Sequence, residues 1–224
     1  MSACLTLDTR RRRAIDRLPT AGLARWLRAP LRALSRAWAE LRIDVALPAD
    51  ELEHELTQLY ERWFMSGASM DDLGGIGASH PGLLFKVRQA DGEWFIYVVD
   101  PARRALAAYI VLSRLVEVNR QLDRQLRSPH AKVARAYRRL GITSAIYRWW
   151  LDGGRSLMSG ERQSPHAHRM WMSLARDYEL LQVRLQDKQL QVLDAADSAS
   201  VLHALGTRMV LLGRGCDARG CAGA

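Results

Sequence analysis

The amino-acid sequence predicts a mixed α/β (α+β) domain in which a central mixed β-sheet is flanked by helices. Three observations predict this class. Two β-rich runs flank Ala90-Asp91-Gly92, which is the pattern of a hairpin turn. A short strand, a turn rich in arginine and glycine, and a helix follow one another between residues 131 and 152. Beyond residue 175, further β-rich runs alternate with a short helical segment.

Composition divides the 224-residue chain into three parts. Residues 1–48 form a basic extension in which Arg10–Arg13 are consecutive and leucines recur at helical spacing, so we expect amphipathic helix there. Residues 49–213 carry the predicted domain, and 214–224 form a glycine-containing tail that we expect to be flexible. An apolar content of 48% with 25% charged residues is typical of a globular protein.

The sequence indicates a cytoplasmic protein. No run approaches the roughly 18 apolar residues that a bilayer span needs. The N-terminus has no apolar core followed by a cleavage site, so it does not resemble a secretory signal. The three cysteines lie near the ends of the chain and do not form a disulfide framework, which favours a reducing compartment.

The first half of the domain reads as one helix followed by strands. Asp50 is a suitable N-cap for a helix over 51–64, and the Gly-, Ser- and Asp-rich segment 65–82 predicts a loop. The apolar run 105–118 fits a third strand or a helix, and its periodicity does not decide between them. We expect a loop or a frayed helix over the polar, basic segment 119–130.

The remaining elements surround the central turn. A strand over 131–136 leads into the sequence RRLGIT, and a helix begins there. The other predicted elements are strands at 83–88, 94–99, 157–159, 179–185, 189–193 and 209–212, and helices at 163–174 and 196–205.

The turn at Arg138–Thr143 predicts an anion site. The first backbone N–H groups of a helix have no partner inside the helix, and the helix dipole adds positive potential. A glycine allows a phosphate to approach this backbone closely, and arginines supply charge-assisted hydrogen bonds. An ordinary loop that leads into a helix would show the same spacing. We therefore treat a phosphate or pyrophosphate site as a hypothesis.

Charge is unevenly distributed. The net charge is +9, and from Arg114 to Arg155 ten Arg and Lys residues face three acidic residues, a local net charge of +7. Such a segment favours an acidic ligand, which could be a phosphorylated cofactor or a nucleic acid. The basic arm over 1–48 could bind nucleic acid or an anionic membrane surface, or it could pack on its own domain.

The order of elements, together with this turn, resembles the GNAT superfamily of N-acetyltransferases. Three further motifs look like those of its phage- and mobile-element-type members: a helix with a mid-helix tyrosine (Gly141-Ile142…Ile146-Tyr147), a strand Leu157-Met158-Ser159, and a helix Gln163-Ser164…Trp171-Met172-Ser173-Leu174. The family signature is Arg/Gln-x-x-Gly-x-Gly/Ala, and its backbone amides hold the pyrophosphate of an acyl-coenzyme A. This sequence keeps the first arginine and the first glycine but has Thr143 in place of the last small residue. The resemblance implies acetyl-coenzyme A or another acyl-coenzyme A as co-substrate, an amine as acceptor, and a cofactor site at Arg138, Arg139, Leu140, Gly141, Ile142 and Thr143.

Candidates for catalysis follow from the chemistry of acyl transfer, which needs a base for the amine proton and an acid for the thiolate. Members of the family often place a tyrosine as acid where this sequence has Trp171, whose indole N–H is too weak an acid. The candidates that remain are Glu161, His168 and Ser164, although Ser164-Pro165 is also a good helix cap. The histidines do not have metal-ligand spacing, so we expect no metal.

Three functions are consistent with these features. The first is an acyl-coenzyme A-dependent N-acyltransferase. The second is a basic nucleic-acid-binding protein, although no nucleic-acid-binding motif is recognised. The third is a GNAT-like interaction or effector module without catalysis, which the departures at Thr143 and Trp171 favour.

Overall fold

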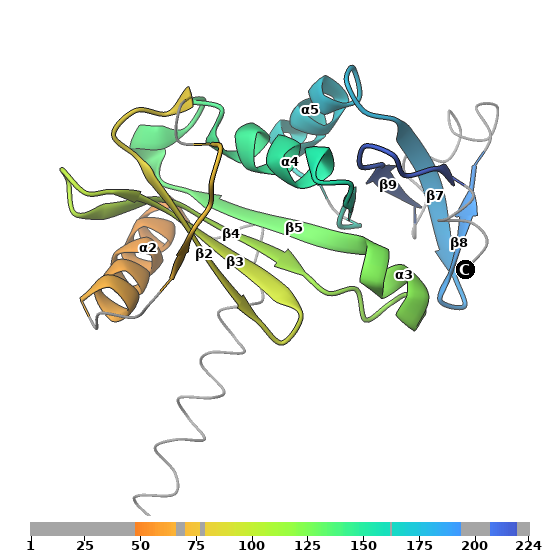
Figure 1. The fold of residues 1–224 in the computed structure, drawn as a ribbon, viewed down its shortest axis with the longest axis horizontal. Coiled ribbons are helices and arrows are strands. Elements are labelled where there is room, and N and C mark those ends of the chain that lie inside the picture. Colours follow the sequence, from red (N-terminus) through yellow and green to blue (C-terminus); the bar gives the residue numbers. More distant parts are fainter. Residues whose placement is uncertain (1–47, 66–69, 77–78, 162, 194–206, 219–224) are drawn as a thin grey trace, which may run out of the picture. The chain divides into compact units, whose positions relative to one another are not determined.

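A mixed β-sheet lies at the centre of the described part of the chain (Figure 1). The computed structural model describes residues 48–65, 70–76, 79–161, 163–193 and 207–218. These residues all belong to the second of two compact units, Val45–Ala224. The predicted extension before residue 48, the predicted helix at 196–205 and the end of the predicted tail lie outside the described residues.

Nine described strands make up the sheet, in the order β1-β2-β3-β4-β5-β6-β9-β7-β8. The pair β5/β6 is parallel and the other pairs are antiparallel, so the sheet is mixed as the sequence predicts. The strands are β1 (Asp71–Asp72), β2 (Leu84–Ala90), β3 (Glu93–Asp100), β4 (Ala105–Ser113), β5 (Leu126–Val133), β6 (Ser156–Met158), β7 (Leu180–Gln186), β8 (Gln189–Val192) and β9 (Thr207–Leu211).

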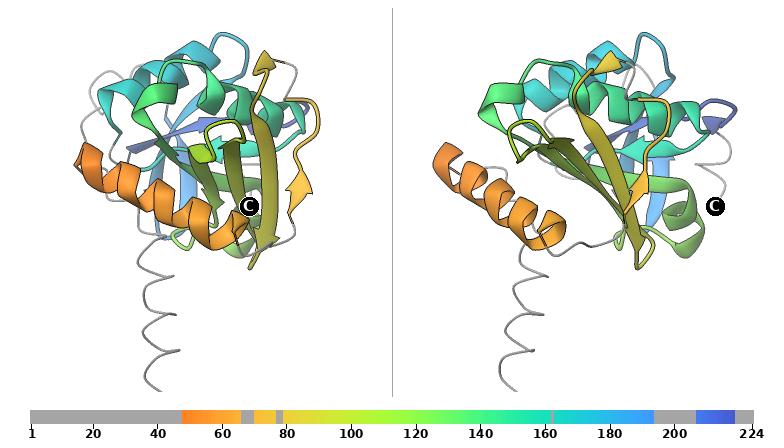
Figure 2. Two further views of the ribbon diagram at one scale, coloured as in Figure 1. Left: turned by 90° about the vertical axis from the view of Figure 1, so that its left-hand side faces the viewer. Right: turned by 60° about the vertical axis from the view of Figure 1, so that its left-hand side comes forward.

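Helices cover both faces of the sheet (Figures 1 and 2). Helix α2 (Ala49–Phe64) packs on one face, where Phe64 meets the ring of Tyr97 at 6.4 Å between centroids. Helices α4 (Ile142–Asp152) and α5 (Pro165–Leu174) lie on the other, where Trp150 of α4 meets Trp94 at 5.3 Å. Trp94 and Tyr97 are three positions apart on β3, so their side chains point to opposite faces. The sandwiched strands β3 and β4 are buried along most of their length.

Two hairpins confirm the turns that the sequence predicts. Asp91 and Gly92 have φ of 53° and 78°, as a two-residue turn between twisted strands requires. The turn between β7 and β8 uses Asp187 and Lys188, with φ of 50° and 62°. The apolar run that fits either a strand or a helix by its sequence forms strand β4.

The prediction of a loop or a frayed helix over 119–130 is wrong in part. Only Arg120–Gln125 is helical (α3). The strand predicted over 131–136 instead runs from Leu126 to Val133 (β5), and a 3₁₀ turn follows it at Arg135–Tyr137. The sequence of β5 looks unlike a strand because its residues from Arg127 to His130 are polar or proline and do not alternate between apolar and polar. Pro129 adds to the misleading appearance, yet a strand accepts proline where its N position faces away from the neighbouring strand.

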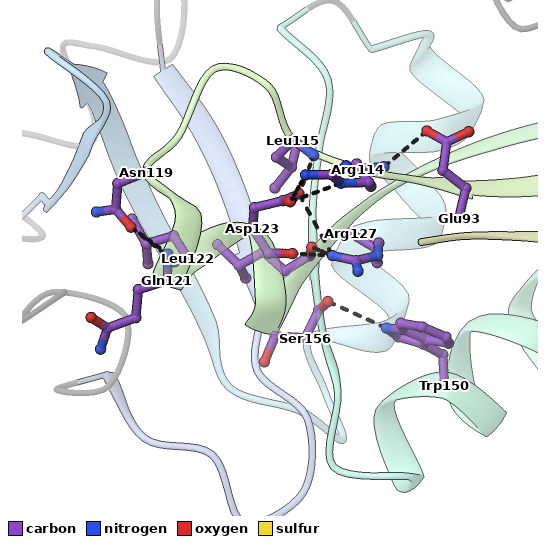
Figure 3. A network of polar contacts seen from close by, with 11 residues as sticks. Glu93, Arg114, Leu115, Asn119, Gln121, Leu122, Asp123, Arg127, Trp150 and Ser156 are labelled. Atoms are coloured by element: carbon purple, nitrogen blue, oxygen red, sulfur yellow. Dashed lines mark hydrogen bonds and ion pairs between the residues drawn. The ribbon is translucent and has the colours of Figure 1, made fainter. Parts of the chain in front are cut away.

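A buried carboxylate holds the connection between β4 and β5 in place (Figure 3). Asp123 of α3 is 6% exposed. Its side chain accepts hydrogen bonds from the Leu115 N–H at 2.8 Å and from Arg114 Nε at 2.9 Å, and Arg127 lies 3.7 Å away. Asn119 caps α3 by accepting from the N–H groups of Gln121 and Leu122. This network holds the start of β5 in place beside β6.

The chain beyond β9 returns to the region between α4 and β6. Gly213 is buried and donates its N–H to Ser156 Oγ at 3.0 Å. The Arg214 N–H bonds to the carbonyl of Leu151, and its side chain pairs with Asp152 at 2.7 Å. A Cβ at Gly213 would lie 2.4 Å from the backbone nitrogen of Arg155, so only glycine permits this approach.

Candidate functional site: an anion-binding turn beside an open strand edge

The turn between β5 and α4 adopts the geometry that an anion site needs. After β5, a short 3₁₀ helix (η2, Arg135–Tyr137) turns the chain, and Tyr137 is buried. The Tyr137 hydroxyl donates to Asp100 Oδ2 at 2.7 Å, which fastens the turn to the end of β3. Arg139 and Gly141 then take left-handed conformations, with φ of 66° and 77°.

Helix α4 begins at this turn without a side-chain cap. Gly141 is its N-cap, and no side chain accepts from the first helical amides. The first intrahelical bond runs from the Ala145 N–H to the Gly141 carbonyl at 2.9 Å, so the three preceding amides have no partner inside the helix. A Cβ at Gly141 would meet nothing within 4 Å, so the space next to the Gly141 backbone is open.

The six predicted cofactor residues differ in what they present. Arg138, Arg139, Leu140 and Gly141 are exposed, while Ile142 is 2% exposed and packs into the core. Ile142 can therefore offer only its backbone N–H. The Thr143 side chain is half-buried in the first turn of the helix. Together these positions present free amides, one left-handed glycine and two exposed guanidinium groups.

His80 supports the turn from a different part of the chain. Its Nε2 lies 3.0 Å from the carbonyl oxygen of Leu140, and its ring packs edge-on against Phe85. A carbonyl can only accept, so Nε2 carries the hydrogen and donates it. Nothing in the sequence pattern connects His80 with a residue so distant in the chain.

Next to the turn, β5 has an open backbone edge. Its pairing with β6 extends only over Leu126↔Ser156 and Arg127↔Leu157. The Ala134 N–H bonds to the Ala107 carbonyl, and in an antiparallel ladder every second residue bonds to the same neighbour. Residues 128, 130 and 132 of β5 therefore bond to β4, whereas 129, 131 and 133 direct their backbone groups away from it.

The outward groups of β5 fit this alternation. Val133 accepts from Arg138 Nε at 3.3 Å on the outer side. Pro129, which has no N–H, stands at an outward position and so removes no bond to β4. By this alternation the N–H and carbonyl of Ala131 point away from β4, and no bond outside the strand ladders that the described residues form involves them. An extended ligand with amide groups can pair with this edge as a further strand would.

The three predicted catalytic residues lie on or before α5. Ser164 caps α5 by accepting from the Ala167 N–H at 3.1 Å, and Pro165 is the first helical residue, as the sequence pattern indicates. Glu161 and His168 are exposed. Trp171 is 2% exposed, so its indole belongs to the core.

His130 is a candidate base that sequence reasoning missed. It lies on β5 next to Ala131, and its side chain shares a face with Lys132. That face carries α2, because Lys132 forms an ion pair with Glu55. Burial lowers the pKa of His130, so the imidazole is neutral near pH 7 and can accept a proton.

Metal-binding clusters and membrane-spanning helices are both absent from the described residues. Nowhere in the described ranges do three His, Cys, Asp or Glu side chains gather as a metal ion would require. No helix within those ranges is long and apolar enough to cross a membrane.

Comparison with known proteins adds one structural neighbour. Neither a protein-family model nor a curated protein sequence matches the chain. A solved structure that resembles it is a phosphinothricin acetyltransferase of the GNAT superfamily from Sinorhizobium meliloti, in complex with acetyl-coenzyme A. The two share 16% sequence identity and a TM-score of 0.34, over 75% of this chain and 87% of the other. At this level of overlap, we base the proposed function on the geometry of the site itself.

Proposed function

We propose that the protein is an acyl-coenzyme A-dependent N-acyltransferase that acts on an amine. The observation that carries the proposal is the juxtaposition of an uncapped helix start with an open strand edge. The amides before Ala145 and the exposed Arg138 and Arg139 suit a pyrophosphate. The outward groups of Ala131 suit the amide-containing arm that links the pyrophosphate to the thioester in any acyl-coenzyme A.

His130 is the base that this arrangement favours. In the reaction, the amine nitrogen attacks the thioester carbonyl carbon, the carbon–sulfur bond breaks, and the thiolate leaves and takes a proton from solvent. The attacking nitrogen loses its proton to a base. His130 follows Pro129 and precedes Ala131, so it stands beside the edge along which the thioester arm would lie. Glu161, exposed before α5, and His168, exposed on α5, remain candidates for the same role.

Binding is tested with a matched pair of variants at Gly141. Asp and Asn both tolerate a left-handed conformation better than other side chains, and a Cβ meets no neighbour at this position. Titration calorimetry with acetyl-coenzyme A should show binding to wild type and to Gly141→Asn. Gly141→Asp adds a negative charge where the pyrophosphate would lie, and its affinity should fall at least tenfold below that of Gly141→Asn. Equal affinity in the two variants, or no binding to wild type, would refute the proposal.

Catalysis is tested separately by thiol release on a panel of amines. His130→Gln should lower kcat about 100-fold, the lower end of what a general base contributes, with the affinity for acetyl-coenzyme A unchanged. Wild-type kcat should fall as the pH drops through the lowered pKa of His130, because the protonated ring cannot accept a proton. The variant should lose this acid limb. An unchanged pH profile in His130→Gln would assign the base to another residue.

The same assays separate this proposal from a GNAT-like module without catalysis. The exposed positions of Glu161 and His168 and the capping role of Ser164 favour this second function. Acetyl-coenzyme A binding that is sensitive to Gly141→Asp, with no turnover on any amine, would establish a binding module. Turnover on any amine would exclude it.

A further inference from the structure

A second candidate site lies along α4, from Ala145 in the first turn of the helix to Arg155 just beyond its C-terminal end. A cleft of 480 Å³ is lined there by Ala145, Arg148, Trp149 and Asp152 of α4 and by Arg155 after it. Gly75, Ile76 and Ser79, which precede β2, line the other side. Because these α4 positions recur every three or four residues, they form one stripe of the helix.

Arg155 is stacked on three tryptophans at this cleft. Its guanidinium carbon lies 3.9 Å from the ring centre of Trp150, 4.8 Å from that of Trp149 and 5.0 Å from that of Trp94. Gly153 leaves room for this arrangement, since a Cβ there would come within 2.9 Å of a terminal nitrogen of Arg155. The three rings pack around the guanidinium group, and the Arg155 side chain is half-buried. Burial accordingly lowers the pKa of Arg155.

The other charges of the cleft are already paired. Arg148 bonds to Asp177 at 2.5 Å. Asp152 bonds to Arg214 at 2.7 Å and accepts from the Tyr178 hydroxyl at 2.8 Å. Arg155 differs from them, because within the described ranges no carboxylate or carbonyl bonds to its side chain. Its Nε is buried without a hydrogen-bond partner, although buried polar groups are rarely left so.

We propose that this cleft, hereafter the Arg155 cleft, binds a ligand in which a flat aromatic ring carries a phosphate or a carboxylate. The planar fork of an arginine matches both oxyanions, and desolvation by the tryptophans strengthens the pairing. Trp149 is only half-buried and offers a ring surface against which a flat group can stack. A nucleotide and an aromatic acid share this chemistry. The proposal does not depend on acyl transfer.

Calorimetry on the full-length protein tests this site with defined probes. The probes are 5′-AMP for the nucleotide class, indole-3-acetate for the aromatic acids, and adenosine and inorganic phosphate as partial ligands. We expect at least one of 5′-AMP and indole-3-acetate to bind at least tenfold more tightly than inorganic phosphate. If the nucleotide is the preferred class, 5′-AMP should also bind at least tenfold more tightly than adenosine. Failure of both ring-bearing anions to bind would overturn the proposal.

Variants then assign the binding to the cleft. Arg155→Met keeps an unbranched apolar chain against the tryptophans and should lower the affinity for the probe at least tenfold. Arg155→Lys keeps the charge without the planar fork and should fall between wild type and Arg155→Met. The matched control is Arg124→Gln on α3, an exposed arginine outside the cleft, which should bind as wild type does. Equal affinity in Arg155→Met and wild type would overturn the proposal.

Two more measurements locate the bound probe on the protein. Gly141→Asp should leave the affinity of the probe unchanged, because Gly141 does not line the cleft and Arg155, which would hold the anion, lies beyond the opposite end of α4. Loss of probe binding in Gly141→Asp but not in Arg155→Met would place the probe at the anion-binding turn and refute the cleft. A measurement on the wild-type protein avoids any folding defect of the variants. The bound probe should slow the modification of Arg155 by phenylglyoxal at least fivefold, as quantified by mass spectrometry. No protection would also count against the site.

Discussion

Substitution of Asp123 should show how much the buried carboxylate in the connection between β4 and β5 contributes to the stability of the protein. Asp123→Asn keeps an oxygen that can accept from the Leu115 N–H but removes the charge that faces Arg114 and Arg127. The Arg127 side chain is 14% exposed and would lose its only carboxylate among the described ion pairs. Removing one partner of a buried pair costs about 3 kcal/mol. Because the Arg114 side chain is 50% exposed, we expect about 2 kcal/mol for Asp123→Asn.

Asp123→Ala should cost more, because the buried Leu115 N–H then also loses its acceptor. The additional cost is about 1 to 2 kcal/mol, the penalty of one unsatisfied buried amide. Urea unfolding followed by circular dichroism gives the free energy of unfolding of wild type and both variants at pH 7. The order expected is wild type, then Asn, then Ala. Equal stability of the Asn and Ala variants would refute the role of the Leu115 bond.

The stability difference between wild type and Asp123→Asn should change with pH in one definite direction. Burial raises the pKa of Asp123, but the Leu115 N–H and the Arg114 guanidinium outweigh burial, and the net pKa lies below its ordinary value. A carboxyl with a lowered pKa stabilises the fold above its unfolded pKa and loses this contribution as the pH falls through its folded pKa. The stability gap between wild type and Asp123→Asn should therefore narrow below about pH 4. A gap that widens in acid would refute the assignment.

Three further substitutions test other parts of the structure. Ser164→Ala removes the cap of α5 and should lower the free energy of unfolding by about 1 kcal/mol, while kcat stays unchanged if Ser164 is only a cap. Ala131→Pro removes an N–H that faces away from β4, so the protein should still fold. Its binding free energy for acetyl-coenzyme A should weaken by about 1 kcal/mol, and unchanged affinity would show that the open edge of β5 is not used. Gly213→Ala places a Cβ 2.4 Å from the Arg155 backbone nitrogen and should lower the free energy of unfolding in urea by about 2 to 3 kcal/mol. A decrease of less than about 0.5 kcal/mol would contradict the close packing at Gly213.

Local sequence patterns predict the features that depend on a few neighbouring residues. Ser164-Pro165 indicates a helix start because a hydroxyl cap and a first-turn proline act within a single turn, and α5 begins there. Asp91-Gly92 indicates a hairpin for the same reason, since both residues accept a positive φ. The fold class follows from the order of such elements.

Features that depend on pairing between distant segments cannot be predicted in this way. The first half of β5 escapes prediction because Arg127, Pro129 and His130 do not alternate clearly between apolar and polar. Its strand character comes from pairing with β4, which the local sequence does not encode. The stacking of Arg155 also depends on Trp94, which a different strand supplies. The same limitation hides His80 and His130, whose surroundings only the tertiary structure defines.

The backbone origin of the anion-binding turn explains why substitutions in the signature need not abolish binding. The free amides belong to the start of α4, and Thr143 is half-buried in that first turn, where its backbone N–H is offered whatever its side chain. Within the turn, Gly141 combines a left-handed φ with open space beside its backbone. Under the proposed function, the binding of a pyrophosphate would depend mainly on one glycine and on positive charge nearby. Catalysis would depend instead on the side chain of one base, so we expect a single substitution at His130 to separate turnover from binding.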